Sequence, residues 1–190
     1  MHAKNSSHDL VDILTINPTI QLDIRYATTN NFTGKAVYLV SKCYLRKAVA
    51  EKIDAIQKEL AHKGLGLKIF DGYRPLSVQR KFWEIFPDER YVANPKNGSR
   101  HNRGSAIDIT LVDLATGQEL EMPSGFDDFT EKAHRDYNNM SENSKKNCQL
   151  LENYMIKYGF IPWPLEWWHF DDQDWEKYPI LDIPFEQLMR

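Results

Sequence analysis

The sequence predicts a single α+β domain with a central, mainly antiparallel sheet that helices flank. Apolar side chains alternate with a period of two, as in half-buried strands, over residues 20–26 and 104–113. They recur every three or four positions, as in amphipathic helices, near residues 44–62 and 144–158. These strands and helices do not alternate regularly, so a parallel βαβ architecture is not expected.

The first half of the chain supplies a strand, a long loop and a helix. Residues 20–26 are the first predicted strand, with their even-numbered side chains on one face. A loop rich in Asn, Thr and Gly follows. The helix is expected from about residue 44 to residue 62, and Gly64 is well placed to end it.

A short strand is predicted at residues 66–71, followed by a tight turn at Gly72–Pro75. The second helix is expected over residues 77–86, because Pro87 ends it. Residues 89–100 read as loop, and the strand at 104–113 comes next.

The C-terminal part contributes a helix and an interrupted apolar run. The helix at 144–158 is expected to be capped by Gly159. Residues 159–170, GFIPWPLEWWHF, are strand-like but are broken by Pro162 and Pro164.

Length and charge limit the classes of function. The 190 residues suit one domain over 1–190, in which residues 1–9 are predicted to be a disordered tail. The hydrophobic content of 42% is near the globular norm, and a chain of this length can bury a core. The formal charge is −3 and there is no basic stripe, so nucleic acid is not an expected partner.

No signal peptide and no membrane-spanning run is recognisable in the sequence. We therefore expect a soluble, cytoplasmic protein without a membrane partner. The two cysteines, Cys43 and Cys148, have no metal or redox spacing and are expected to be reduced. Nothing in the sequence predicts an oligomeric state.

A carboxylate in an apolar strand is the first chemical signal. Asp108 lies among Ala and Ile residues, where it must be paired, hydrogen-bonded or bound to a metal. His101 lies seven residues earlier, and a turn or bulge at Gly104 would bring both side chains to one side. The pair suits half of a zinc site, and His169 is the best candidate for a third ligand. The alternative is a structural hydrogen-bonded pair of His101 and Asp108.

Three protein ligands with one open position are typical of catalytic zinc. Such a site needs a base, and Glu166, three residues before His169, is the natural candidate. The alternative is that Glu166 and His169 form an ordinary pair at the edge of the core. Arg74 could stabilise a developing oxyanion, although a single arginine is most often a surface or capping residue.

The segment EWWH sets a geometric condition. A regular strand would place Glu166 and His169 on opposite faces. The backbone is therefore predicted to bend between them. At least one of Trp167 and Trp168 is expected to pack away from the site.

Taken together, these segments resemble one family. SRHNRGSAID (residues 99–108) matches the pattern S-x-H-x-x-G-x-A-x-D, and EWWH matches E-x-x-H. Both patterns belong to the zinc D-alanyl-D-alanine dipeptidases of the VanX type. The segments IRYATTNNFTGKAVY, DGYRP and GFDDF are similar to other signature stretches of that family. The short stretch between DGYRP and SRH is similar to that of the shorter, salvage-like members.

The resemblance implies a role for each matching residue. One Zn2+ per chain would be bound by His101, Asp108 and His169. Glu166 would be the general base and acid, and Arg74 would polarise the scissile carbonyl. The substrate-binding residues would be Asp127 and Tyr26 at the substrate ammonium and Ser99 near its carboxylate.

The resemblance also implies the fold and the reaction. The fold would be that of the zinc D,D-peptidases and hedgehog-like domains. The reaction would be hydrolysis of free D-alanyl-D-alanine, in peptidoglycan dipeptide salvage or glycopeptide resistance. A D,D-carboxypeptidase and a non-catalytic zinc module are the alternatives. The presence of both Glu166 and Arg74 argues against the latter, because a structural site needs neither.

Overall fold

The computed structural model describes residues 9–189, and a five-stranded sheet forms its centre. In spatial order the strands are β2 (Gln21–Leu22), β4 (Leu65–Asp71), β5 (Ala106–Asp113), β7 (His169–Asp172) and β6 (Phe160–Pro162). The β2–β4 pair is parallel, and the other neighbouring strands are antiparallel. The predicted α+β fold with a mainly antiparallel sheet is confirmed.

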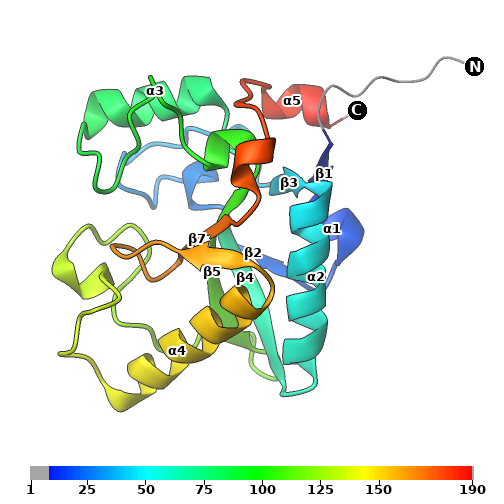
Figure 1. Cartoon of the computed structure of the whole chain (residues 1–190), viewed down its shortest axis with the longest axis vertical. Coiled ribbons are helices and arrows are strands. Elements are labelled where there is room, and N and C mark those ends of the chain that lie inside the picture. The colour runs from blue at the N-terminus through cyan, green and yellow to red at the C-terminus, as the bar shows by residue number, and fades with distance from the viewer. Residues whose placement is uncertain (1–8, 190) are drawn as a thin grey trace, which may run out of the picture.

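Among residues 9–189, a small second sheet and five α-helices surround this centre. The second sheet pairs β1 (Leu10–Asp12) with β3 (Tyr44–Arg46) in antiparallel register. The α-helices are α1 (Ile13–Ile16), α2 (Lys47–Ala61), α3 (Leu76–Ile85), α4 (Glu142–Lys157) and α5 (Phe185–Leu188). In Figure 1, α3 lies at the top and α4 at the bottom, with β5, β6 and β7 between them, and α2 runs along one side. Single 3-10 turns occur at Arg25–Ala27, His101–Arg103, Glu131–Ala133 and Trp175–Lys177.

Strand β5 is the centre of the core. All of its residues except the last are buried, so both of its faces are covered. Leu151 and Met155 of α4, and Ile53 and Ile56 of α2, are among the fully buried apolar side chains. Burying one such side chain contributes about 1.5–3 kcal/mol. A rigid core thus holds the middle of the sheet, where the strand that carries Asp108 lies.

One predicted strand is shorter in the structure, and one predicted helix begins later. The strand predicted at 20–26 pairs only over Gln21–Leu22, because the chain leaves the sheet and forms a 3-10 turn at Arg25–Ala27. The helix predicted from residue 44 begins at Lys47, because residues 44–46 pair with β1 instead. Long-range pairing with residues 10–12 outweighs the local helical pattern there.

The predicted tight turn at Gly72–Pro75 was wrong. These residues connect β4 to α3 without a turn, and Pro75 precedes the first residue of α3. The glycine is needed for close packing, because a Cβ at Gly72 would lie 2.6 Å from the Cys43 sulfur and 2.9 Å from the Tyr44 carbonyl oxygen.

Residues 1–8 of the predicted tail lie outside the described residues. Asp9 accepts hydrogen bonds from the Lys47 amide and the Arg46 guanidinium. Between residues 9 and 189, no helix has the length and apolar character needed to cross a membrane. The thiols of Cys43 and Cys148 are both free.

Candidate metal centre and its cleft

Strand register places the first two candidate ligands. Asp108 on β5 lies directly opposite His169 on β7. Cross-strand partners project to the same face of a sheet, so the two side chains meet. The distance between Asp108 Oδ1 and His169 Nδ1 is 3.0 Å. The sheet itself therefore builds this half of the site.

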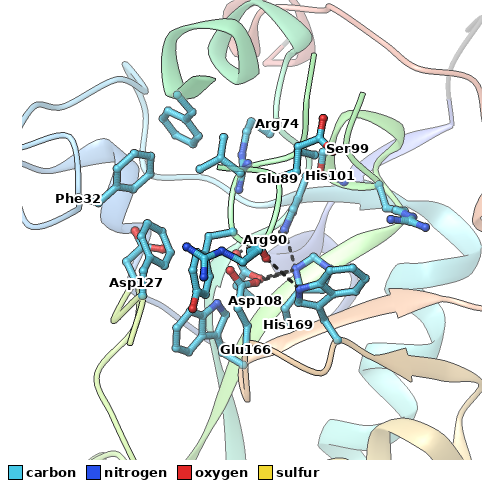
Figure 2. A pocket seen from close by; sticks show the side chains of 18 of the residues that line it. Phe32, Arg74, Glu89, Arg90, Ser99, His101, Asp108, Asp127, Glu166 and His169 are labelled. Atoms are coloured by element: carbon cyan, nitrogen blue, oxygen red, sulfur yellow. Dashed lines mark hydrogen bonds and ion pairs between the residues drawn. The ribbon is translucent and has the colours of Figure 1, made fainter. Parts of the chain in front are cut away.

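The third candidate ligand comes from the turn that precedes β5. His101 begins a 3-10 turn that ends at Gly104, whose φ of 69° is left-handed and favours glycine. The predicted turn at Gly104 is confirmed. It brings His101 Nε2 to 3.4 Å from Asp108 Oδ2 and 3.2 Å from His169 Nδ1. Figure 2 shows the three side chains converging.

The outer nitrogens of both imidazoles have partners of their own. His101 Nδ1 lies 2.7 Å from the Gly72 carbonyl oxygen, which can only accept, so this nitrogen carries the proton. His169 Nε2 lies 2.8 Å from Asp171 Oδ1. Carbonyl and carboxylate partners of this kind orient metal-binding histidines. When both rings are neutral, His101 Nε2 and His169 Nδ1 therefore present lone pairs to each other.

With both rings neutral, two facing lone pairs beside a carboxylate attract a cation to the point between them. The separations of 3.0–3.4 Å are close to the roughly 3.3–3.6 Å expected between tetrahedral ligands about 2.0–2.2 Å from zinc. All three ligand atoms lie within 4.8 Å of one another. The group His101, Asp108 and His169 thus fits a divalent metal ion by its donor set and its spacing.

We expect metal binding to release a proton from His169. Burial disfavours its charged form, but Asp171 and Asp108 outweigh burial and raise its pKa to about 10 in the metal-free protein. Metal ions bind the neutral ring, so at pH 7 the ion must displace this proton. Below the pKa the metal dissociation constant should fall about tenfold per pH unit as pH rises. Zinc titration by calorimetry between pH 6.5 and 8.5 measures this slope, and a flat profile would contradict it.

Glu166 lies beside this centre because the backbone bends. Residues 163–168 form the loop between β6 and β7, and the His169 amide donates to the Glu166 carbonyl oxygen at 3.3 Å. This turn puts both side chains on one side, with Glu166 Oε2 3.8 Å from His169 Nδ1. The predicted bend is confirmed. Burial raises the pKa of Glu166 to about 8, although His169 opposes the shift.

The two adjacent tryptophans of this loop, Trp167 and Trp168, face opposite ways. Trp168 lines the cleft, whereas Trp167 donates its indole N–H to Ser124 Oγ on the other side. Both side chains are almost fully buried. The expectation that at least one of them packs away from the site is confirmed.

Arg74 is a buried part of the cleft wall and is not a surface residue. Its Nε and Nη2 donate to Asp71 Oδ2 at 3.1 and 2.8 Å, and its Nη1 donates to Gln79 Oε1 at 2.8 Å. A guanidinium has five N–H groups, so one on each terminal nitrogen remains for another acceptor. Burial acts to lower the pKa of Arg74, but Asp71 outweighs it and raises the pKa. The charge is therefore fixed in place.

The opposite side of the cleft holds an acceptor that lacks a partner. Asp127 has a φ of 61°, and its Oδ1 accepts a hydrogen bond from the Tyr26 hydroxyl at 3.1 Å. Its Oδ2 is buried without a hydrogen-bond partner among residues 9–189. Burial, together with the charge of Asp108, raises the pKa of Asp127 to about 8. Such a carboxylate is stabilised by any cationic group that enters the cleft.

Ser99 lies next to the metal centre. Its Oγ accepts from the His101 amide at 3.1 Å, which leaves the hydroxyl proton free to donate elsewhere. The eight predicted site residues, which are Tyr26, Arg74, Ser99, His101, Asp108, Asp127, Glu166 and His169, all line one cleft with a volume of about 100 Å³. In Figure 2, Asp127 and Phe32 lie on one side of this cleft and His101 on the other.

Three residues whose side chains bind those of His169 or Arg74 were missed from the sequence. Asp171 lies two residues after His169 and therefore on the same face of β7, which is a readable signal. Asp71 ends an apolar strand, in the same way that Asp108 interrupts one. Gln79, which binds Arg74, carries no signal in the sequence.

Comparisons with known proteins found a matching family model, similar sequences and similar solved structures. A model of the D-ala-D-ala dipeptidase family matches residues 6–186. The D-alanyl-D-alanine dipeptidase of Escherichia coli (strain K12) is 38% identical over 180 residues, which cover 93% of this chain and 91% of the relative. The enzyme of the same name from Enterococcus faecium is 36% identical over 187 residues, covering 87% and 92%. A solved structure of VanYB in complex with D-Alanine-D-Alanine is 15% identical, with a TM-score of 0.48, and the match covers 74% of this chain and 77% of that one.

Proposed function

The chain belongs to the D-ala-D-ala dipeptidase family, and from this premise we propose that it hydrolyses free D-alanyl-D-alanine to two D-alanines. It is a metallopeptidase. One observation carries the proposal. The metal-binding group, a buried carboxylate within 3.8 Å of it and an unpaired acceptor all line one small cleft.

One zinc ion per chain is the proposed cofactor, held by His101, Asp108 and His169. When bound, zinc lowers the pKa of water towards 7 and polarises carbonyl oxygens. The protonation pattern of the two imidazoles supports this assignment, because it leaves His101 Nε2 and His169 Nδ1 facing a common point.

Glu166 is the proposed general base and acid. Its carboxylate takes a proton from the attacking water and then gives it to the leaving amine. A pKa raised towards 8 by burial suits a group that must both accept and release a proton near neutral pH. Arg74 supplies fixed positive charge, and its two remaining N–H groups stabilise the oxygen on which negative charge develops.

The substrate ends are assigned to opposite sides of the cleft. Asp127 Oδ2 pairs with the substrate ammonium, while Tyr26 holds Oδ1 of the same carboxylate. The Ser99 hydroxyl donates to the substrate carboxylate. A dipeptide with two free ends satisfies all of these groups, whereas a blocked or longer peptide leaves Asp127 unpaired.

We expect wild-type protein to prefer free D-Ala-D-Ala over its N-acetyl derivative. Leaving one partner of a buried charge pair unsatisfied costs about 3–5 kcal/mol, or roughly two to four orders of magnitude in kcat/KM. Measuring D-alanine release from both compounds tests this preference. Asp127→Asn should lower kcat/KM for the free dipeptide. It should therefore reduce the ratio of kcat/KM for the free dipeptide to kcat/KM for the N-acetyl derivative.

The result also separates the two catalytic alternatives. Preference for the acetylated peptide would favour a D,D-carboxypeptidase and refute the dipeptidase proposal.

A single catalytic domain, a cytoplasmic location and the absence of nucleic-acid and membrane partners remain predictions from the sequence.

A further inference from the structure

Arg135 contacts both ends of the loop that carries Glu166, residues 163–168 between β6 and β7. Its Nε donates to the Trp163 carbonyl oxygen at 2.7 Å, and its Nη2 donates to the His169 carbonyl oxygen at 3.0 Å. Its backbone amide donates to the Pro164 carbonyl oxygen at 2.9 Å. Arg135 therefore holds both ends of the loop between β6 and β7, and the Trp167 amide in its middle donates to the Ala133 carbonyl oxygen at 2.9 Å.

The loop needs this external support. Pro164 has no N–H, and two of the hydrogen bonds that the loop makes for itself are long. These are Glu166 amide to Trp163 carbonyl at 3.4 Å and His169 amide to Glu166 carbonyl at 3.3 Å. The bonds from Arg135 are shorter and charge-assisted, and such bonds are roughly twice as strong as neutral ones.

Arg135 is itself fixed in position. Its Nη1 donates to Glu152 Oε2 on α4 at 2.8 Å, and its guanidinium lies 4.5 Å from the centre of the Phe170 ring. Burial lowers the pKa of Arg135 and Glu152 opposes that shift, so the carboxylate offsets the cost of the buried charge. A link thus runs from α4, in the rigid core, to the loop that carries Glu166. In Figure 1 the loop of residues 163–168 (orange) extends beside the yellow-green segment that precedes α4.

We propose that Arg135 is a positioning residue for the hydrolysis. By holding the carbonyl oxygens of Trp163 and His169, it fixes the loop so that Glu166 Oε2 lies 3.8 Å from His169 Nδ1, which faces Asp108. Arg135 does not line the cleft, so it acts on the reaction through these two side chains. The inference rests on the proposed function.

The test compares Arg135→Met and Arg135→Lys with wild type by kcat, KM and the zinc dissociation constant. For Arg135→Met we expect kcat to fall about 10²-fold, because a displacement of about 1 Å can cost this much. The zinc dissociation constant should rise about 10–100-fold. KM should change by less than about threefold, because the substrate anchors are untouched. Arg135→Lys should lie in between, because one ammonium cannot bridge both carbonyls.

Two further variants sharpen the comparison. Glu152→Gln removes the charge that holds Arg135 and should give a smaller loss of the same kind. Lys132→Ala removes an exposed cation from the same segment and should match wild type, because its ammonium makes no hydrogen bond or ion pair with residues 9–189.

The outcomes separate positioning from plain stability. A variant that melts earlier but keeps kcat and zinc affinity within twofold of wild type would overturn the proposal. If Arg135→Met does not fold, Arg135→Lys decides by the same two measurements. If wild type itself does not hydrolyse the dipeptide, the proposed function fails, and the zinc dissociation constants still test the role of Arg135.

Discussion

Replacing Glu166 by alanine is expected to lower kcat by about 10²–10⁴-fold, the usual contribution of general acid–base catalysis, while zinc stays bound. Glu166 Oε2 lies 3.8 Å from His169 Nδ1 and forms no hydrogen bond with the three candidate ligands. The ligand group should therefore survive the substitution. Release of D-alanine from D-Ala-D-Ala, with zinc content measured on the same preparation, tests both parts.

Control variants define what each result means. Glu166→Gln keeps the shape but removes the basic oxygen, so it should lose turnover as alanine does. Glu84→Ala removes an exposed carboxylate of α3 and should change nothing. Full turnover in zinc-loaded Glu166→Ala would refute the assignment of Glu166 as the general base. Loss of zinc would show that Glu166 helps to hold the ion, contrary to the division of roles proposed above.

Asp108, Glu166 and His169 were predictable as site residues because each breaks a local rule. Asp108 is a carboxylate inside an apolar strand, and Glu166 and His169 are ionisable neighbours of two indoles. Such conflicts between residue type and surroundings concentrate at functional sites. Their geometry was not predictable in the same way. The direct opposition of Asp108 and His169 depends on the register of β5 with β7, which no local pattern specifies.

The residues that support the site were harder to predict. Arg135 binds backbone carbonyl oxygens 28 and 34 positions away, and backbone oxygens are the same at every position. A sequence pattern therefore cannot indicate such a contact. The strand at residues 44–46 was not predicted either, because its pairing with residues 10–12 depends on the whole fold and not on the local sequence. Local propensity predicted the helix that follows but not the residue at which it begins.

Substituting Asp108 should remove most of the affinity for zinc. It is the one anionic member of the ligand group, and the other two members are neutral when they bind metal. Zinc sites bind with about 10–16 kcal/mol, so one of three or four ligands is worth roughly 3–5 kcal/mol. Asp108→Ala should therefore raise the zinc dissociation constant about 10²–10⁴-fold, as measured by chelator competition, and turnover should fall with zinc occupancy.

Asp108→Asn separates charge from packing in this experiment. The amide keeps the volume and one acceptor oxygen in a strand whose neighbours are buried, so the sheet should stay intact. It supplies no negative charge to offset a divalent ion in a buried site, so zinc affinity should fall nearly as far as in Asp108→Ala. Asp113→Asn, at the half-buried end of the same strand, is the matched control and should bind zinc normally. Wild-type zinc affinity in Asp108→Ala would place the ion elsewhere and remove the basis for assigning His101 and His169 as its ligands.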